Sequence, residues 1–383
     1  MRVSFQKEYP VVPARLNPTR VGPCSWQMKH DILAHRPSDL NVSWAQRVVN
    51  CRCSNVTVSK VNLVSVDIGT TTRIRLTVEH DGPTTLSRKW FVKLPSLAWR
   101  ARMITALPGL LHTEARFYNE TAQAVPIIIP CFLGGQSKPG KGATLVLCDV
   151  TEFGATAGNP GDALKADQAA LVIKQLARLH ACFWNKLEPL RKYGWLAGPV
   201  RRLEDHLGTA LAVPLMKRGL QRAGKIIPSA LHTPAVNYAW CRRRAMRFLS
   251  DAPQTLVHHD CHPGNLFWSQ SQPGLLDWQL VRFGEGTGDL AYFLATALMP
   301  EVRRDHETRL LGIYAQELRN SGVENIDMDT LKQRYRAHLV YPFEAMVVSL
   351  AVGGMIEQGI NRELIRRTAA AVQDLDAFAA IPL

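Results

Sequence analysis

The sequence of 383 residues has no uninterrupted apolar run of the roughly 18 to 20 residues that a membrane-spanning helix requires. Its N-terminal segment contains basic side chains but lacks the apolar core of a secretory signal. The eight cysteines are scattered along the chain, apart from Cys51 and Cys53, which indicates reduced thiols and not a disulfide framework. These absences predict a cytoplasmic protein that does not bind a membrane.

Acidic residues are in the minority, with 32 against 46 lysine and arginine residues, so the formal net charge is +14. Residues 201–250 contain ten basic residues and only two acidic ones, Glu204 and Asp205. The chain nevertheless lacks zinc-finger spacing, an RNA-binding aromatic signature and a basic zipper, so we expect no nucleic-acid partner. The basic cluster is interpreted either as a solvated helix face or as a funnel for an anionic substrate.

Hydrophobic periodicity changes along the chain, and no internal repeat accompanies it. Residues 1–38 show no clear period and predict an irregular lead-in. Residues 39–150 contain mostly period-two segments, whereas residues 151–383 are mainly helical in pattern. The sequence therefore predicts an α+β protein with a small N-terminal antiparallel sheet lobe and a larger, mainly helical C-terminal lobe, divided in the loop after Asp149.

The same patterns predict the individual elements. Alternating apolar and polar residues predict strands over 56–66, 73–80, 88–95, 126–133 and 143–150. Spacings of three and four residues predict helices over 39–49, 113–123 and 166–184, and three helices within 301–383. A short strand–turn–strand unit, NLFW–SQSQPG–LLDW, interrupts the helical lobe at residues 265–278.

The segment HHDCHPGN, residues 258–265, permits two interpretations. Its side chains His258, His259, Cys261 and His262 are competent transition-metal ligands. Four ligands within five consecutive residues cannot converge on one ion without severe backbone contortion, and the sequence has no second ligand pair to complete such a site. The spacing His-x-Asp-x-x-x-x-Asn, followed by a second aspartate, instead favours phosphoryl transfer.

Phosphoryl transfer to a hydroxyl needs a carboxylate base, oxygen ligands for Mg²⁺ and a cation on the nucleotide phosphates. Asp260 is the expected base, and His258 is expected to hold the loop by hydrogen bonds. Asn265 and Asp277 are the expected Mg²⁺ ligands, because the Pro-Gly pair turns the loop and the hairpin returns Asp277 beside Asn265.

The cation and its partner are predicted upstream. Lys93 lies on a predicted strand, and Glu114 lies at the start of the next helix, so we expect the two to pair and to hold the ammonium on the α- and β-phosphates. Glu120, later on the same helix, is the alternative partner.

Two further segments are expected on the nucleotide side. In LVLCDV, the hinge residues Leu147, Asp149 and Val150 are expected to offer backbone groups to an adenine edge. Gly69 and Thr70, between two predicted strands, either cover the phosphates or form an ordinary hairpin turn, and both interpretations remain open.

Together these motifs resemble the aminoglycoside phosphotransferase and choline kinase superfamily, and most of all its ecdysteroid-kinase-like branch. The resemblance covers about residues 40–350 and depends on VKLP, ExxFY, LVLCDV, LARLHACFW, HHDCHPGN, LLDWQ and GDLAYFL. It implies a bilobal protein-kinase-like fold, ATP and Mg²⁺ as cofactors, and phosphorylation of a hydroxyl on a small metabolite, xenobiotic or antibiotic. We expect a monomer or a homodimer.

Several residues depart from the protein-kinase or superfamily pattern. Asp277-Trp278-Gln279 stands where protein kinases have Asp-Phe-Gly, and no long activation loop follows, which argues against a protein substrate. Cys148 lies in the hinge, which leaves the choice between ATP and GTP open. Asp289 of GDLAYFL is expected to cap its helix and tie it to the catalytic loop, and Trp278 to lie in the core or line the acceptor pocket. A catalytically inactive kinase-like binding module is the main alternative, and a basic nucleic-acid-binding protein is the other.

Overall fold

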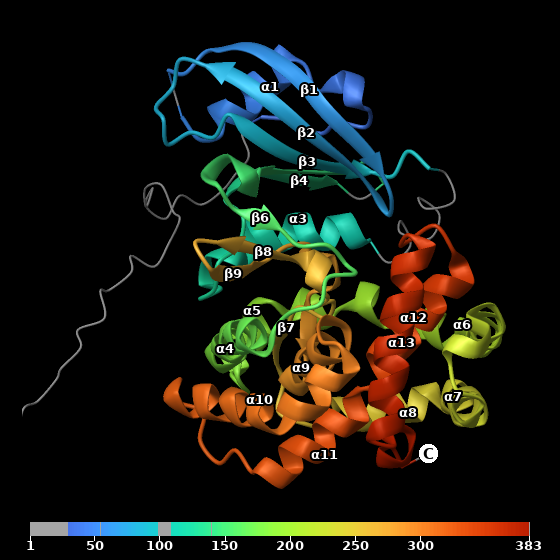
Figure 1. Cartoon of the computed structure of the whole chain (residues 1–383). Coiled ribbons are helices and arrows are strands. Elements are labelled where there is room, and N and C mark those ends of the chain that lie inside the picture. Colours follow the sequence, from blue (N-terminus) through green and yellow to red (C-terminus); the bar gives the residue numbers. More distant parts are fainter. Residues whose placement is uncertain (1–29, 54, 99–108, 139, 383) are drawn as a thin grey trace, which may run out of the picture.

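The computed structural model of the chain describes residues 30–53, 55–98, 109–138 and 140–382, which form two lobes (Figure 1). The N-terminal lobe contains a five-stranded antiparallel sheet with the strand order β1-β2-β3-β5-β4. Its elements are β1 (Val58–Ile68), β2 (Thr71–His80), β3 (Lys89–Pro95), β4 (Phe132–Lys138), β5 (Gly142–Cys148), α1 (Val42–Asn50) and α3 (Leu110–Glu120).

Strand β3 shows how alternation distributes side chains between the two faces of the sheet. Trp90, Val92 and Leu94 are buried in an apolar cluster against α1, where Trp90 meets Trp44 edge to face with ring centroids 6.1 Å apart. Lys93 lies between Val92 and Leu94 and therefore points to the opposite face, toward Glu114 of α3 and Asp277 of the C-terminal lobe. The period of two thus delivers one buried lysine to the junction of the lobes.

The C-terminal lobe consists mainly of helices packed around the largest apolar cluster of the described residues. Its helices are α4 (Ala166–Phe183), α5 (Leu187–Lys192), α6 (Pro199–Ala223), α7 (His232–Trp240), α8 (Arg242–Ser250), α9 (Gly286–Ala297), α10 (Pro300–Asn320), α11 (Met328–His338), α12 (Val340–Val352) and α13 (Gln358–Asp374). Its short strands are β6 (Thr156–Ala157), β7 (Thr255–Val257), β8 (Leu266–Ser269), β9 (Gln272–Leu275) and β10 (Arg282–Gly284). The predicted bilobal α+β fold is therefore confirmed.

The hairpin predicted between Asn265 and Asp277 is present, with β8 antiparallel to β9. A two-residue turn, Gln270-Ser271, joins the strands, and both residues have positive φ angles of 47° and 65°. Two successive positive φ angles are typical of the type I′ turn, whose twist matches that of a β-ribbon. The turn is shorter than the predicted six-residue loop because Ser269 belongs to β8 and the residues from Gln272 to Gly274 belong to β9.

Two predicted elements differ from the structure. The strand predicted over 126–133 begins only at Phe132, because Ile128 forms an isolated bridge to β9 of the other lobe. The tail from residue 301 contains the four helices α10 to α13 and not the predicted three, because the helical segment is interrupted at Leu339, between α11 and α12. Pro342 falls in the first turn of α12, where proline is tolerated, and this was the available signal for a new helix.

Residues 1–29 of the predicted lead-in lie outside the described part of the chain. The segment that follows has neither helix nor strand until the 3₁₀ turn Pro37–Asp39, after which Asn41 caps α1 by accepting a hydrogen bond from the amide of Trp44. No helix of the described residues is long and apolar enough to cross a membrane.

Candidate functional site

The loop after β7 is fixed by one buried carboxylate. Asp289, in the first turn of α9, accepts hydrogen bonds from the backbone amides of His258 and His259, both at 2.7 Å, and from His180 Nε2 at 3.3 Å. Burial would raise the pKa of Asp289, but the hydrogen bond and charge of His180 outweigh it and hold that pKa below its usual value. The predicted tie between α9 and the loop is present, whereas no side-chain cap of α9 is formed.

Asp260 stands at the centre of this loop, with its side chain 26% exposed. Its Oδ1 accepts a hydrogen bond from the hydroxyl of Tyr292 at 2.7 Å, and its Oδ2 accepts one from Asn265 Nδ2 at 3.0 Å. Asn265 Nδ2 also donates to the Asp260 carbonyl at 2.9 Å. Both carboxylate oxygens are thereby oriented, while the amide oxygen of Asn265 takes no part in these bonds.

The turn between these two residues is the predicted one. Pro263–Asn265 form a single 3₁₀ turn, in which the Asn265 amide donates to the His262 carbonyl. Glycine at position 264 is required by close approach, since a Cβ there would lie 2.6 Å from Pro160 Cγ. The segment after β6, which contains Pro160, therefore packs directly against the loop.

Leu276 connects this loop to the second aspartate. Its amide donates to the Asn265 carbonyl at 2.8 Å, and its own carbonyl accepts from His258 Nε2 at 2.7 Å. His258 therefore holds the loop by hydrogen bonding, as predicted from the sequence. Asp277 follows in the left-handed backbone region, with φ 60°. That conformation is uncommon for a residue other than glycine, and it is flanked by the contacts of Leu276 on one side and by the hydrogen bond of the Trp278 amide to Glu114 on the other.

Lys93 is shared between two carboxylates. Its Nζ lies 2.8 Å from Glu114 Oε2 and 3.0 Å from Asp277 Oδ1, and the Lys93 and Glu114 side chains are 3% and 0% exposed. The amide of Trp278 donates to Glu114 Oε1 at 3.2 Å, so Glu114 touches both lobes. The predicted Lys93–Glu114 pair is present, and the alternative partner Glu120 pairs instead with Arg116 on the surface.

The three charges shift one another's ionisation. Burial raises the pKa of Glu114 to about 7, although the neighbouring Lys93 opposes that rise. Burial also acts to raise the pKa of Asp277, but the charge of Lys93 outweighs it and the pKa falls below its usual value. At neutral pH the site therefore holds an ionised Asp277 and a Lys93 ammonium, with Glu114 close to its titration point.

The donor atoms suit a hard divalent cation. Asp277 Oδ1 is buried and has no aligned hydrogen bond despite its ion pair with Lys93, and Asn265 supplies a second oxygen through its amide. Mg²⁺ prefers carboxylate and amide oxygens, completed by phosphate oxygens and water. The residues predicted to hold Mg²⁺ therefore fit that ion by donor chemistry.

The four side chains of the transition-metal interpretation point to different partners. His258 Nε2 donates to Leu276, and His259 stacks on Tyr341 with ring centroids 4.3 Å apart. His262 Nδ1 accepts from the amide of Gly264, and Cys261 is fully buried. Within the described residues, no three histidine, cysteine, aspartate or glutamate side chains converge in a way that could hold a metal ion.

The other residues predicted to contact the nucleotide lie in β5, in the segment that follows β5, and in the turn between β1 and β2. Leu147 lies in β5 and faces the same side of the sheet as Lys93. Asp149 caps the 3₁₀ turn Val150–Phe153, accepts from Arg75 Nε at 3.0 Å, and has both its backbone amide and its carbonyl engaged by other residues. The side chain and backbone of Asp149 therefore stabilise the segment after β5, and contact of the hinge backbone with an adenine edge stays a prediction.

Gly69 and Thr70 form the turn between β1 and β2. The Gly69 amide donates to the Thr71 carbonyl, and the Gly69 carbonyl accepts from Ser96 Oγ at 2.7 Å. The turn is thereby tied to the end of β3, two residues beyond Leu94 on the strand that carries Lys93.

Two contacts near the loop were not predicted, and a third side chain takes one of its two predicted positions. Tyr292 and His180 belong to motifs recognised in the sequence, but the contact of Tyr292 with Asp260 depends on the packing of α9 against the loop, and that of His180 with Asp289 on the packing of α9 against α4. Trp278 is fully buried and stacks on Phe117 at 4.3 Å, so it lies in the core and does not line an acceptor pocket.

The basic cluster of residues 201–250 divides into two kinds of residue. Arg201 and Arg242 are buried and pair with Glu204 and Glu344, at 2.6 and 2.7 Å. The other eight basic residues of this segment are exposed. Arg201 also donates to Thr113, beside Glu114, so it connects α6 to the helix that carries the partner of Lys93. The two buried arginines therefore serve the fold and are not available to a substrate.

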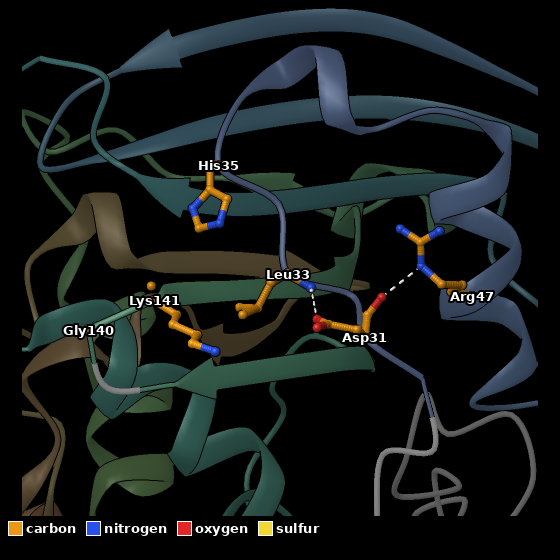
Figure 2. Close-up of a pocket in the computed structure, with 7 residues that line it drawn as sticks. Asp31, Leu33, His35, Arg47, Gly140 and Lys141 are labelled. Atoms are coloured by element: carbon orange, nitrogen blue, oxygen red, sulfur yellow. Dashed lines mark hydrogen bonds between the residues drawn. The ribbon is translucent and has the colours of Figure 1, made fainter.

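A surface hollow in the N-terminal lobe lies apart from these residues (Figure 2). Asp31, His35, Arg47 and the turn at residues 140–142 line it. Its polar groups are partly engaged with one another, because Arg47 Nε donates to the Asp31 carbonyl and the Asp31 carboxylate accepts from the Leu33 amide. No residue predicted for the site lies in it.

A sheet lobe and a helical lobe that meet at a buried lysine, beside a loop carrying an aspartate and an asparagine, define the class of kinase-like proteins. The chain belongs to the ecdysteroid kinase-like family, whose model matches residues 70–325. A comparison with curated protein sequences finds no significant match.

Among solved structures, the chain is similar to three small-molecule kinases at low sequence identity. An ethanolamine kinase of Plasmodium vivax is 12% identical, with 83% of each chain covered and a TM-score of 0.45. A choline kinase of Cryptosporidium parvum is 10% identical, with 85% of this chain and 92% of that one covered and a TM-score of 0.46. An aminoglycoside 2′-phosphotransferase in complex with GDP is 11% identical, with 88% and 98% covered and a TM-score of 0.48.

Proposed function

We propose that the chain is an ATP- and Mg²⁺-dependent phosphotransferase that phosphorylates a hydroxyl of a small molecule. The observation that carries the proposal is the position of Asp260, whose two carboxylate oxygens are held by Tyr292 and Asn265 while the side chain remains partly exposed. Membership of the ecdysteroid kinase-like family supports it.

In this proposal Asp260 accepts the proton of the acceptor hydroxyl as its oxygen attacks the terminal phosphorus. The hydrogen bonds from Tyr292 and Asn265 fix the direction of the carboxylate, so it need not reorganise during the reaction. Lys93 holds the α- and β-phosphates, and Glu114 positions the Lys93 ammonium. Asn265 and Asp277 would hold Mg²⁺, which when bound supplies charge neutralisation for the phosphates.

The nucleotide would lie against the face of the sheet that carries Lys93. We propose that the hinge from Leu147 to Val150 receives the base and that the turn at Gly69 and Thr70 lies over the phosphates. The acceptor would lie between the catalytic loop and the helices α6, α12 and α13. A preference for an anionic acceptor would depend on exposed arginines such as Arg243 and Arg244, since Arg242 is already paired with Glu344.

The test is a panel of hydroxyl-bearing metabolites and antibiotics incubated with Mg·ATP and scored by mass spectrometry for a product heavier by one phosphoryl group. Asp260→Asn should lower kcat by about 10²- to 10⁴-fold, the usual contribution of a general base, without changing the fold. Asp329→Asn, an exposed aspartate of α11, is the matched control and should retain full activity.

An Asp260→Asn variant with undiminished turnover would contradict the assigned base. Nucleotide binding without phosphorylation of any acceptor would favour the alternative of an inactive kinase-like binding module.

A further inference from the structure

Four cysteines that are distant in the sequence gather behind the hinge. Cys51, Cys53, Cys131 and Cys148 all pack against the apolar cluster between α1 and the sheet, on the face opposite to Lys93. Arg52 lies among them, and its charge acts on all four sulfur atoms. None of these thiols reacts in the proposed phosphoryl transfer, although Cys148 belongs to the proposed hinge.

Cys131 and Cys148 are the pair that the backbone brings closest together. They stand one position beyond the paired residues Phe132 and Leu147 of β4 and β5, and the Cys148 amide donates to the Cys131 carbonyl at 2.8 Å. Directly opposed residues of an antiparallel pair have Cα atoms about 4.5 to 5.5 Å apart, within the roughly 4.4 to 6.8 Å that a disulfide spans. A bond between them therefore needs no rearrangement of the sheet.

The two thiols differ in reactivity. A hydrogen bond from Cys148, assisted by the charge of Arg52, lowers the pKa of Cys131 to about 7, although burial and Glu152 oppose that shift. The same hydrogen bond and burial raise the pKa of Cys148, with Ser87 as its other polar neighbour. Cys131 is only half-buried and Cys148 is buried. A small oxidant thus reaches Cys131 first, in the thiolate form that reacts.

We propose that Cys131 and Cys148 form a redox modification site that a hydroperoxide converts to a disulfide. The Cys131 thiolate attacks one peroxide oxygen, so an S–O bond forms, the O–O bond breaks and the leaving oxygen takes a proton to become water or an alcohol. The Cys148 sulfur then attacks the Cys131 sulfur, an S–S bond forms, the S–O bond breaks, and the hydroxide leaves as water with the Cys148 proton. The two sulfur atoms together lose two electrons, which the peroxide gains.

The bond would act on the hinge from behind. Cys148 is the last residue of β5, and the next residue, Asp149, donates its amide to the Lys89 carbonyl. A disulfide replaces the contact of Cys148 with Ser87 and ties the end of β5 to the start of β4. This consequence, weaker nucleotide binding in the oxidised form, rests on the proposed function, whereas the formation of the disulfide does not.

The experiment uses the full-length reduced protein treated with an equimolar amount of hydrogen peroxide, alkylated under native conditions and analysed by peptide mass spectrometry. The expected product is a Cys131–Cys148 cross-linked peptide, lighter by two hydrogen atoms and reversed by a thiol reductant. Cys131→Ser should abolish the cross-link. Cys182→Ser is the matched control, because Cys182 is half-buried on α4 and lies outside the cluster, and it should leave the cross-link unchanged.

Three results would overturn the proposal: both cysteines still fully alkylated after oxidation, Cys131 oxidised without a cross-link, or a bond from Cys131 to Cys51 or Cys53. Because Cys148 is buried and its replacement endangers the fold, the half-buried Cys131 carries the test. Titration with a non-hydrolysable ATP analogue before and after oxidation separates the two proposals. A cross-link with unchanged affinity refutes only the effect on the hinge, and a reduced protein that binds no nucleotide refutes the proposed function alone.

Discussion

On the N-terminal side of the site, Lys93 is held by side-chain charge, whereas the loop on the other side is held through its backbone amides. Lys93 lies between the carboxylates of Glu114 and Asp277, with all three groups buried or partly buried. The loop instead presents two successive amides to the single carboxylate of Asp289. The two halves of the site meet at Asp277, which belongs to the loop side and pairs with the lysine of the other.

This difference teaches which changes each half tolerates. A buried set of charges depends on its balance, so the loss of one partner leaves an uncompensated charge in a low-dielectric setting. The Asp289 carboxylate positions the loop by accepting hydrogen bonds from two backbone amides. A replacement of the same shape that cannot accept both hydrogen bonds therefore displaces Asp260. Substitutions on the two sides should therefore be separable by their dependence on pH and by the kinetic constant they change.

The largest effect is expected from Lys93→Met. Removing the shared cation leaves Glu114 and Asp277 facing each other, which should cost about 3–5 kcal/mol of stability. Phosphoryl transfer should fall by about 10²- to 10³-fold, the usual loss when one preorganised charge contact is removed. Because protonation of Glu114 relieves the repulsion, the loss of stability should be larger above neutral pH than below it. Urea unfolding across that range, together with steady-state kinetics, measures both.

Lys89→Met is the matched control, since Lys89 is an exposed lysine on the same strand. A Lys93→Met protein as stable and active as the wild type would show that the charge triad is not what holds this half of the site.

The sequence carried enough information to predict the Lys93–Glu114 pair, but not that Asp277 would also contact Lys93. Alternation in β3 puts Lys93 opposite Trp90 and Val92, and a lysine facing the lobe junction needs a carboxylate from the next helix. It could not predict that Tyr292 would reach Asp260, because that contact joins residues 32 positions apart through the packing of α9 against the loop.

Asp149 shows a second limit of the sequence. A hinge aspartate can face a ligand or stabilise the chain, and the choice here depends on Arg75 of a neighbouring strand. The pattern around Leu339 shows a third, since that helix break contains no glycine and only Pro342 indicates it. Patterns thus predict the faces of elements and the motif residues, whereas partners from distant segments require the packed structure.

Glu285 lies on the loop side of the site but is held by charge, so it tests which of these two features makes the stability of the protein depend on pH. It precedes α9, the helix that carries Asp289, but it is held by charge, with His338 Nε2 and Arg334 Nη2 both at 2.6 Å. Burial would raise its pKa, but the hydrogen bond and charge of His338, assisted by Arg334, hold it at about 2. A lowered carboxylate pKa contributes stability above the unfolded value of about 4.5 that is lost as pH falls toward about 2.

Glu285→Gln should therefore lose about 3 kcal/mol at neutral pH and almost nothing at the acid end of that window. Urea midpoints measured from neutral pH down to that range give the comparison. Curves for the variant and the wild type that stay parallel throughout would show that the ionisation of Glu285 does not stabilise the fold.

Asp289→Asn is the counterpart of the lysine substitution on the loop side. The amide group replaces one acceptor by a donor, so the amide of either His258 or His259 loses its partner, at a cost of about 1–3 kcal/mol. Because the change displaces Asp260 and not the nucleotide, we expect kcat to fall while the KM for ATP stays unchanged. Asp305→Asn, an exposed aspartate on α10, is the control. A rise in the KM for ATP with an unchanged kcat would contradict the separation of the two halves.

The smallest effect is expected where the hairpin joins the two halves. Gln270 and Ser271 both adopt positive φ angles in an exposed turn, a conformation that Asn-Gly adopts with less strain. The double substitution Gln270→Asn with Ser271→Gly should therefore stabilise the protein by about 0.5–1 kcal/mol, because relief of the roughly 1–2 kcal/mol left-handed strain at position 271 exceeds the entropic cost of a glycine. The turn lies at the far end of β8 and β9 from Asn265 and Asp277, so activity should not change. A stabilised protein with altered kcat would show that the hairpin transmits strain to the site, and that the left-handed backbone of Asp277 depends on the turn as well as on Leu276.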